Sequence, residues 1–286
     1  MRVLIIGCGY VGLPLGAELV RQGHEVFGLR RTDRALAEMT AAGIQPLRAD
    51  ISQPTQLARL PAEYDWVVDA VSATGGGLED YRAVYLEAAR HLVAWLGAQP
   101  PAKFVYTSST GVYGQTDGST VDESSPTEPA AETARVLVEA EAVLLAAARQ
   151  QAFPAVILRL AGIYGPGRGY WLRQYLQGEA RIEGDGGRLL NMIHRDDVVG
   201  AILATLRRGR VGQVYNAVDD EPVSQRTLFE WLAKQYGGPL PPTVPPDALA
   251  QRKRGVTNKR ISNRKLTTEL GYAFKYPTFR EGFLAL

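Results

Sequence analysis

The fold is decided by the segment Val3-Leu4-Ile5-Ile6-Gly7-Cys8-Gly9-Tyr10-Val11-Gly12. An apolar run leads directly into three glycines spaced G-x-G-x-x-G, and this motif carries meaning when a strand precedes it and a helix follows. Gly7 permits a tight turn, Gly9 lets backbone N–H groups approach a pyrophosphate, and Gly12 lets the helix pack close to the strand. The positive end of that helix then faces the phosphates. The segment predicts a dinucleotide-binding loop, with contacts from Gly7, Gly9, Tyr10, Val11 and Gly12.

Arginines follow the second predicted strand, residues 25–29, where a carboxylate would bind the adenosine ribose and repel a 2′-phosphate. Arg30 and Arg31 stand there instead, and Arg34 follows a turn later. Guanidinium groups bind phosphate through paired hydrogen bonds, so the cofactor NADP(H) is favoured over NAD(H). The alternative interpretation is a solvated basic turn.

Residues after the third and fourth strands complete the predicted cofactor cleft, because ligands bind at the carboxyl ends of parallel strands. Asp50 and Ile51 are expected to receive the adenine. Val71 and Ser72 are expected to line the floor of the same cleft.

The chain alternates apolar strands with segments of helical period, the pattern of an α/β doubly wound parallel sheet of Rossmann type. Strands are expected at residues 3–6, 25–29, 45–49, 65–71, 103–107 and 155–160, with helices at 10–22, 33–42, 79–96 and 132–150. Right-handed crossovers predict the strand order 3-2-1-4-5-6. Residues 165–190 and 237–260 differ in composition and are expected to leave the sheet and form a lid.

Composition excludes several classes of protein. Of 286 residues, 45% are apolar and 22% charged, which is typical of a soluble globular chain. The net charge of +2 is too mild to indicate nucleic acid binding. A single cysteine, Cys8, rules out an internal disulfide, and with three scattered histidines it predicts no metal site. The first apolar run is too short for a membrane span or signal peptide, so a cytoplasmic location without membrane partners is expected.

Four further segments carry a family resemblance. They are residues 107–114 (TSSTGVYG), 159–166 (RLAGIYGP), 193–198 (IHRDDV), and 215–217 (YNA) followed by 221–224 (EPVS). With the glycine loop they resemble extended short-chain dehydrogenases/reductases of the NAD-dependent epimerase/dehydratase type. The tail from residue 261 to 277 is similar to an atypical branch of these proteins.

The resemblance implies a cofactor-binding domain of residues 1–164 plus about 191–218, and a smaller substrate domain of about 165–190 and 219–286. It adds Thr107, Ser108 and Ile163 to the cofactor contacts. It also implies a nucleotide sugar or similar small polar substrate, and a homodimer through the helices at 79–96 and 132–150.

The chain departs from the family at its proton relay, a Tyr and a Lys four residues apart on the helix after the fifth strand. The Tyr exchanges a proton with the substrate, and the Lys lowers its pKa and holds the nicotinamide ribose. Aligning Glu141 with a carboxylate of that helix puts Thr133 at the Tyr position and Leu137 at the Lys position. A register shifted by two gives Ala131 and Arg135, so neither register restores the pair.

The candidates for catalysis are Ser109, Tyr113 and Thr133. Ser109 matches the family serine that hydrogen-bonds the reacting oxygen; the alternative is a serine that caps the loop backbone. Tyr113 and Tyr164 match family positions, either as proton donors or as the wall of the cleft.

Other polar residues have a structural and a functional interpretation each. A glutamate of the loop before the relay helix is either a base or solvated charge, and His194 with Asp196 and Asp197 is expected mainly to begin a helix. The arginines between residues 168 and 188 have two interpretations. They either bind a diphosphate beside aromatic rings that stack on a base, or lie on the solvent side of an amphipathic helix at 171–176. The basic run 252–260 is interpreted as a solvated face. The loop glutamates are Glu123, Glu128 and Glu132; the arginines and aromatics are Arg168, Arg173, Arg181, Arg188, Tyr170, Trp171 and Tyr175.

Two hypotheses about function follow from the sequence. The first is an NADP(H)-dependent oxidoreductase or epimerase/dehydratase with a replaced proton relay. The alternative is a non-catalytic NADP(H)-binding sensor or regulatory protein, favoured by the absent Tyr and Lys. A titratable Tyr or Glu within hydrogen-bond reach of the hydride acceptor would favour the enzyme, and a plugged cleft would favour the sensor.

Overall fold

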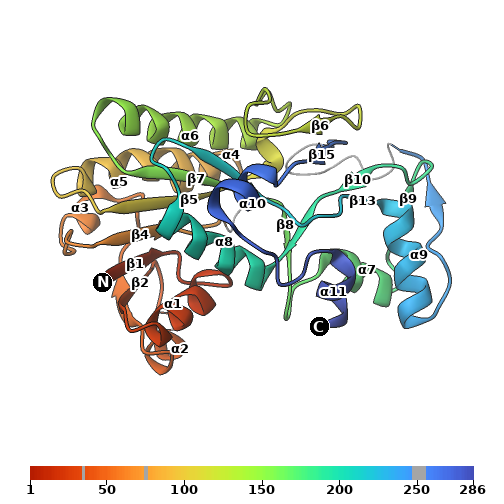
Figure 1. Ribbon diagram of the computed structural model, residues 1–286, viewed down its shortest axis with the longest axis horizontal. Coiled ribbons are helices and arrows are strands. Elements are labelled where there is room, and N and C mark those ends of the chain that lie inside the picture. Colours follow the sequence, from red (N-terminus) through yellow and green to blue (C-terminus); the bar gives the residue numbers. More distant parts are fainter. Residues whose placement is uncertain (34–35, 74–76, 247–255) are drawn as a thin grey trace.

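The computed structural model describes residues 1–33, 36–73, 77–246 and 256–286 (Figure 1). Arg34 and the first part of the basic run, residues 252–255, lie outside the described residues. The chain folds around a seven-stranded sheet, from which the C-terminal half extends to a second, smaller body of helices and short strands (Figure 1).

All seven strands of the main sheet run parallel, in the order β12-β7-β5-β4-β1-β2-β3. The predicted order of the first six strands is confirmed, and β12 extends the sheet beyond β7. The strands are β1 (Arg2–Ile6), β2 (Glu25–Arg30), β3 (Gln45–Arg48), β4 (Trp66–Asp69), β5 (Lys103–Ser109), β7 (Ala155–Leu160) and β12 (Val214–Ala217).

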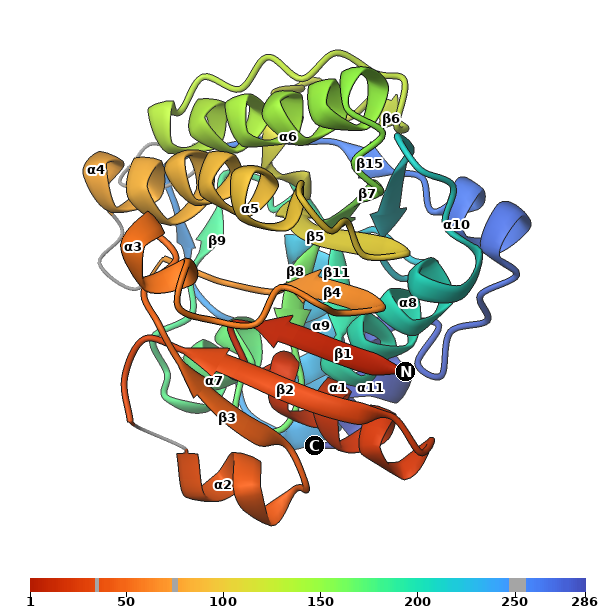
Figure 2. The ribbon, with the colours of Figure 1, turned by 90° about the vertical axis from the view of Figure 1, so that its left-hand side faces the viewer.

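Helices cover both faces of this sheet (Figure 2). One face carries α5 (Ala88–Leu96) and α6 (Glu132–Gln150), and the other carries α1 (Gly12–Arg21) and α8 (Arg195–Arg208). Two smaller helices complete this part of the chain: α2 (Leu36–Ala41) connects β2 to β3, and α3 (Pro54–Leu57) lies between β3 and β4. The predicted helix at 79–96 consists of α4 (Leu78–Tyr81), a π-helical segment (Arg82–Glu87) and α5. Helix α1 begins two residues later than expected, because the glycine loop takes up the chain before Gly12.

A second apolar core is built from separated segments. Tyr164, Leu190 and Met192 pack there with Phe229 and Phe283. Its elements are β8 (Gly162–Tyr164), α7 (Tyr170–Leu176), β9 (Ile182–Glu183), β10 (Leu189–Leu190), β11 (Met192–His194), β13 (Val223–Ser224), α9 (Gln225–Tyr236), β14 (Thr243–Val244) and α11 (Phe279–Leu284).

The chain between α9 and α11 returns to the main body. Strand β15 (Arg260–Ile261) pairs with β6 (Thr120–Val121). Helix α10 (Arg264–Leu270) buries Leu266 and Leu270 in the first core. The division into two domains at about residue 219 therefore stays a prediction, with α10 on the side of the larger core.

The predicted homodimer face needs an apolar outer surface on α5 and α6. Instead, Arg82 and Glu139 form an exposed ion pair there, and the large exposed apolar side chains found in the described ranges lie on other elements. The homodimer stays a prediction without that support. Within the same ranges, no helix combines the length and apolar composition that crossing a bilayer requires.

Candidate functional site

The glycine loop has the close contacts that its sequence predicts. Gly7 has φ +79°, and a Cβ atom there would lie 2.8 Å from the backbone of Ala70. A Cβ on Gly12 would lie 2.7 Å from the Gly7 carbonyl oxygen. At Gly9 the nearest atom to such a Cβ would be Nη1 of Arg30, at 3.8 Å, so the space in front of this glycine is open. The loop therefore exposes its backbone at Gly9, at the carboxyl ends of β1 and β4.

A cavity of about 340 Å³ lies in front of this loop. The structure brings the predicted cofactor residues together around it, except Gly12, which lies behind the loop. The predicted residues in its lining are Gly7, Gly9, Tyr10, Val11, Arg30, Arg31, Asp50, Ile51, Val71, Ser72, Thr107, Ser108 and Ile163. Thr32, Tyr85 and Arg168 also line it and were not predicted as cofactor contacts.

The end of β2 lines this cavity with positive charge. Nη1 of Arg30 donates to the Cys8 carbonyl oxygen at 3.0 Å, which fixes this side chain over the loop. Arg31 is exposed at the rim. Asp33, the nearest acidic residue along the chain, binds Arg48 at 3.2 Å. Arg31 is thus available to a ligand, and Arg30 already holds the loop.

A buried polar network connects the end of β5 with three neighbouring elements. The Arg159 Nη2 and Glu141 Oε2 atoms are 2.7 Å apart, and both side chains are less than a tenth exposed. The Ser108 hydroxyl donates to Glu141 at 2.6 Å. Arg159 donates to the Tyr113 hydroxyl at 2.7 Å, and that hydroxyl donates to Asn216 at 2.9 Å. The network joins β5, α6, β7 and β12.

This network binds the hydroxyl of Tyr113, one of the candidate proton donors. Its side chain is fully buried, and its hydroxyl lies in the network rather than in either cavity. Burial raises its pKa, which further disfavours proton transfer.

Helix α6 carries the positions of the absent Tyr and Lys. Leu137 lines the cofactor cavity one helical turn from the Thr133 position, consistent with the first register. Thr133 is in the lining of neither cavity. In the register that aligns Glu141 with the family carboxylate, an apolar side chain therefore takes the position of the family's lysine.

A second cavity of about 270 Å³ adjoins the first. Ser109 and Ile163 line both. The Ser109 hydroxyl accepts a hydrogen bond from the Gly111 N–H at 3.1 Å, so it caps the loop and faces both cavities. The remaining wall comes from the second core and from β15. Its members include Tyr164, Tyr170, Trp171, Arg188, Asn191, Lys259 and Phe283.

The arginine-rich segment divides between the two interpretations of its sequence. Trp171 and Tyr175 pack against Phe229, as the amphipathic-helix interpretation expects. Arg188 lies within the second cavity, its guanidinium 5.7 Å from the Trp171 ring centroid and its Nε 3.5 Å from a Glu183 carboxylate oxygen. Arg168 lines the cofactor cavity over the Tyr10 ring, 5.3 Å from its centroid.

Lys259 was missed by the sequence interpretation. We assigned the basic run 252–260 to a solvated face, yet Lys259 is only 3% exposed. Its ammonium donates to the Tyr113 carbonyl oxygen at 2.7 Å and to the Thr257 hydroxyl at 2.9 Å. Burial lowers its pKa to about 8. The interpretation of the run is wrong at this position, because the pairing of β15, which begins directly after Lys259, brings this residue into the cavity lining.

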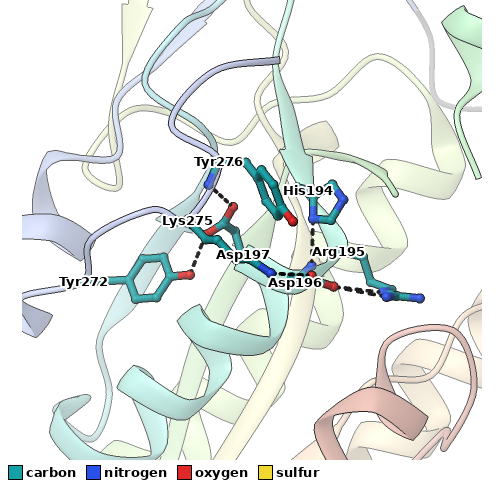
Figure 3. A network of polar contacts seen from close by, with 7 residues as sticks. All are labelled: His194, Arg195, Asp196, Asp197, Tyr272, Lys275 and Tyr276. Atoms are coloured by element: carbon teal, nitrogen blue, oxygen red, sulfur yellow. Dashed lines mark hydrogen bonds and ion pairs between the residues drawn. The ribbon is translucent and has the colours of Figure 1, made fainter. Parts of the chain in front are cut away.

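The segment His194–Asp197 has the structural role that was expected (Figure 3). His194 Nδ1 accepts from the Asp196 N–H at 3.2 Å and caps α8. Asp197 accepts from the Tyr272 hydroxyl at 2.7 Å and from the backbone N–H groups of Lys275 and Tyr276 at 2.7 and 2.9 Å. This carboxylate ties the C-terminal segment to α8.

The loop glutamates lie away from both cavities. Glu123 accepts from the Asn216 N–H at 2.7 Å, and burial raises its pKa. Glu128 and Glu132 are exposed. None of the three is in the lining of the cavities that Ser109 shares.

A parallel sheet with a glycine loop at its carboxyl edge, and a second cavity closed by C-terminal segments, defines a Rossmann protein of the short-chain dehydrogenase/reductase superfamily. A family model described as "NAD dependent epimerase/dehydratase family" matches residues 3–217. The chain belongs to this family.

Three similar proteins illustrate the relationship. Protein YeeZ of Escherichia coli K12 is 30% identical over 283 residues, 96% of each chain. The dTDP-6-deoxy-L-talose 4-dehydrogenase (NAD(P)(+)) of Kitasatospora kifunensis is 26% identical over 264 residues, 86% of this chain and 82% of that one. The solved structure of a functionally unknown conserved protein from Silicibacter pomeroyi is 32% identical, with a TM-score of 0.82 over 100% of this chain and 97% of that one.

Proposed function

We propose that this protein is an NADP(H)-dependent oxidoreductase whose proton relay differs from that of its family. Its substrate is a nucleotide sugar or a similar small polar carbonyl or alcohol. The observation that carries the proposal is that the cofactor cavity and a second cavity meet at Ser109 and Ile163. This arrangement allows a substrate in the second cavity to meet the reactive end of a cofactor in the first.

The residues around the first cavity fit a dinucleotide. The open space at Gly9 admits a pyrophosphate, and the N-terminus of α1 favours its charge. We assign Asp50 and Ile51 to the adenine and Thr107, Ser108 and Ile163 to the nicotinamide end; all five line the first cavity, and Ile163 also lines the second. When bound, the nicotinamide ring supplies or accepts a hydride.

The preference for NADP(H) rests on Arg30 and Arg31. They line the cavity at the end of β2, where a carboxylate would select NAD(H). The exposed Arg31 is the one we assign to the 2′-phosphate, since Arg30 already binds the Cys8 carbonyl.

The second cavity supports a polar, anionic substrate. Arg188 and Lys259 line it and provide two cationic groups. Trp171 and Tyr170 lie in the same lining and provide aromatic faces for stacking. The similarity to dTDP-6-deoxy-L-talose 4-dehydrogenase agrees with a nucleotide sugar. Ser109 is placed to hydrogen-bond the reacting oxygen.

The sensor remains the second candidate because Leu137 lines the cofactor cavity at the expected lysine position. A protein that only reports cofactor binding has no need of that cation. The second cavity favours the enzyme, because it is not filled by the described side chains.

The test is NADPH oxidation, followed by the loss of nicotinamide absorbance, across keto nucleotide sugars and simple carbonyl compounds. We expect turnover with at least one of them, and loss of that turnover in Ser109→Ala with NADPH binding retained. NADPH binding without turnover on any substrate would favour the sensor instead.

A further inference from the structure

Lys259 lines the second cavity together with Ser109, although the two residues are 150 positions apart in the sequence. Its ammonium donates to the carbonyl oxygen of Tyr113, which directly follows the short helix Thr110–Val112 that Ser109 caps. Ser109, Thr110, Gly111 and Lys259 line the same cavity. The lysine is thereby fixed against the loop that carries the serine proposed to bind the reacting oxygen.

The backbone around Lys259 is held on both sides. Asn191 donates from Nδ2 to the Lys259 carbonyl oxygen at 2.9 Å, and its Oδ1 accepts from the Ile261 N–H at 3.0 Å. The Arg260 N–H donates to the Ser119 carbonyl at 2.9 Å. These contacts pin β15 beside β6, so the side chain of Lys259 has a defined direction.

The charge around Lys259 is unusual for a buried ammonium. The other titratable groups in the lining are Tyr164, Tyr170 and Arg188, and no carboxylate belongs to the lining formed by residues 1–33, 36–73, 77–246 and 256–286. Its two acceptors, a carbonyl and a hydroxyl, are neutral and use two of three N–H bonds. Burial without a counter-ion lowers the pKa of this lysine to about 8, which brings proton release close to neutral pH.

We propose that Lys259 is the proton donor to the reacting oxygen, in place of the family's Tyr and Lys; this inference rests on the proposed function. In the reduction, the substrate carbonyl carbon accepts a hydride, with its electron pair, from reduced nicotinamide. The carbonyl π bond breaks onto oxygen, and the alkoxide takes a proton from the Lys259 ammonium. The substrate leaves as an alcohol, and the neutral amine regains a proton from water. In the oxidation the same amine accepts the proton.

The other candidates are placed less well for this task. The Tyr113 hydroxyl is bound to Arg159 and Asn216 outside both cavities. Thr133 lines neither cavity, and threonine has no accessible acidity near neutral pH. Arg188 lines the cavity, but a guanidinium does not release its proton in this pH range.

The first test needs no turnover. The wild-type protein is treated with benzaldehyde and cyanoborohydride, which benzylate neutral amines, and the modified peptides are quantified at several pH values. We expect Lys259 to react at least about tenfold faster at pH 7.5 than the exposed Lys275, whose pKa is raised by its neighbours, and to reach half of its maximal rate near pH 8. Reaction of Lys259 no faster than Lys275 would overturn the proposal, because a carbonyl compound could not reach the amine.

The second test uses variants in the NADPH oxidation assay. Lys259→Met should lower kcat at least about 100-fold with NADPH affinity unchanged. Lys259→Arg should fold normally and also lose turnover, since arginine keeps the charge but not the acidity. Lys265→Met, on α10 outside both cavities, is the control and should match the wild type. Wild-type rates in Lys259→Met overturn the inference and leave the proposed function standing; absence of turnover in the wild type overturns both.

Discussion

Glu141 and Arg159 form an ion pair with 2.7 Å between Oε2 and Nη2, buried between α6 and β7 directly behind the cofactor cavity. Ser108 and Tyr113 complete the hydrogen bonds of this pair. Charges removed from water are tolerated only when their partners satisfy them, so the four side chains depend on one another. The pair positions Ser108, which lines the first cavity.

Breaking this pair should destabilise the fold strongly. Glu141→Gln leaves the Arg159 charge without its counter-ion, and we expect the free energy of unfolding to fall by about 3–5 kcal/mol in urea titrations. Glu139→Gln, on the same helix, breaks the exposed pair with Arg82 and is the control; it should cost less than about 1 kcal/mol. Equal losses in the two variants would contradict the role of the buried pair.

Gly7 should tolerate no side chain. Gly7→Ala places a Cβ 2.8 Å from the Ala70 backbone at a φ of +79°, so we expect loss of NADPH binding in calorimetry and a lower melting temperature. Gly23→Ala has a similar φ of +83° but nothing within 4 Å of its Cβ. This control should show only the backbone strain, about 1–2 kcal/mol, with NADPH binding retained. If Gly23→Ala weakens NADPH binding as much as Gly7→Ala, the close approach at Gly7 is not the cause.

Stability should depend on pH through Asp69, at the end of β4. Burial raises the pKa of this carboxyl to about 7, against the opposing hydrogen bond from the Val71 N–H. Between the unfolded value near 3.8 and pH 7 the folded protein holds a proton that the unfolded chain has released, so stability falls as pH rises through this window. Asp69→Asn removes this dependence.

The comparison is made by urea titration at pH 5 and pH 8. As the pH rises from 5 to 8, we expect the free energy of unfolding of the wild type to fall by up to about 3 kcal/mol relative to that of Asp69→Asn. A parallel pH dependence in the two proteins would show that Asp69 does not titrate as its burial implies.

Ser109 and Thr133 should differ in their effect on turnover. Ser109 lines both cavities, so Ser109→Ala should lower kcat about 100-fold, as removal of an oxyanion hydrogen bond does. Thr133→Ala, at the position of the family tyrosine but outside both cavities, should keep kcat within about threefold. Steady-state kinetics with NADPH decide this, and a greater loss in Thr133→Ala would return the relay to α6.

The sequence predicts the sheet and the cofactor loop well, because their signals are local. The glycine spacing and the alternation of apolar strands with helical segments predict β1 to β5 and β7 without reference to distant residues. Strand β6 is not among the predicted strands, and it pairs with the distant β15. The first register for α6 also agrees with Leu137 in the cofactor cavity.

The substrate side is different because it is assembled from distant segments. Lys259 reaches the cavity only through the pairing of β15 with β6 and the bonds of Asn191, and no periodicity of the basic run indicates that pairing. Tyr113 matches a motif position, yet the direction of its side chain depends on Arg159 and Asn216, which lie on other strands. Buried polar partners on other strands leave no signal in a linear pattern, so the sequence alone does not indicate that the Tyr113 hydroxyl lies outside both cavities.

The assignment of the first cavity to NADP(H) is tested most directly by calorimetric titration of the wild-type protein and Arg31→Asp with NADPH and with NADH. We predict that the wild type binds NADPH more tightly than NADH, and that Arg31→Asp loses about 10- to 100-fold in NADPH affinity while NADH affinity is kept. Arg149→Asp, at the exposed end of α6, should change neither. Tighter binding of NADH by the wild type, or no binding of either nucleotide, would contradict the account.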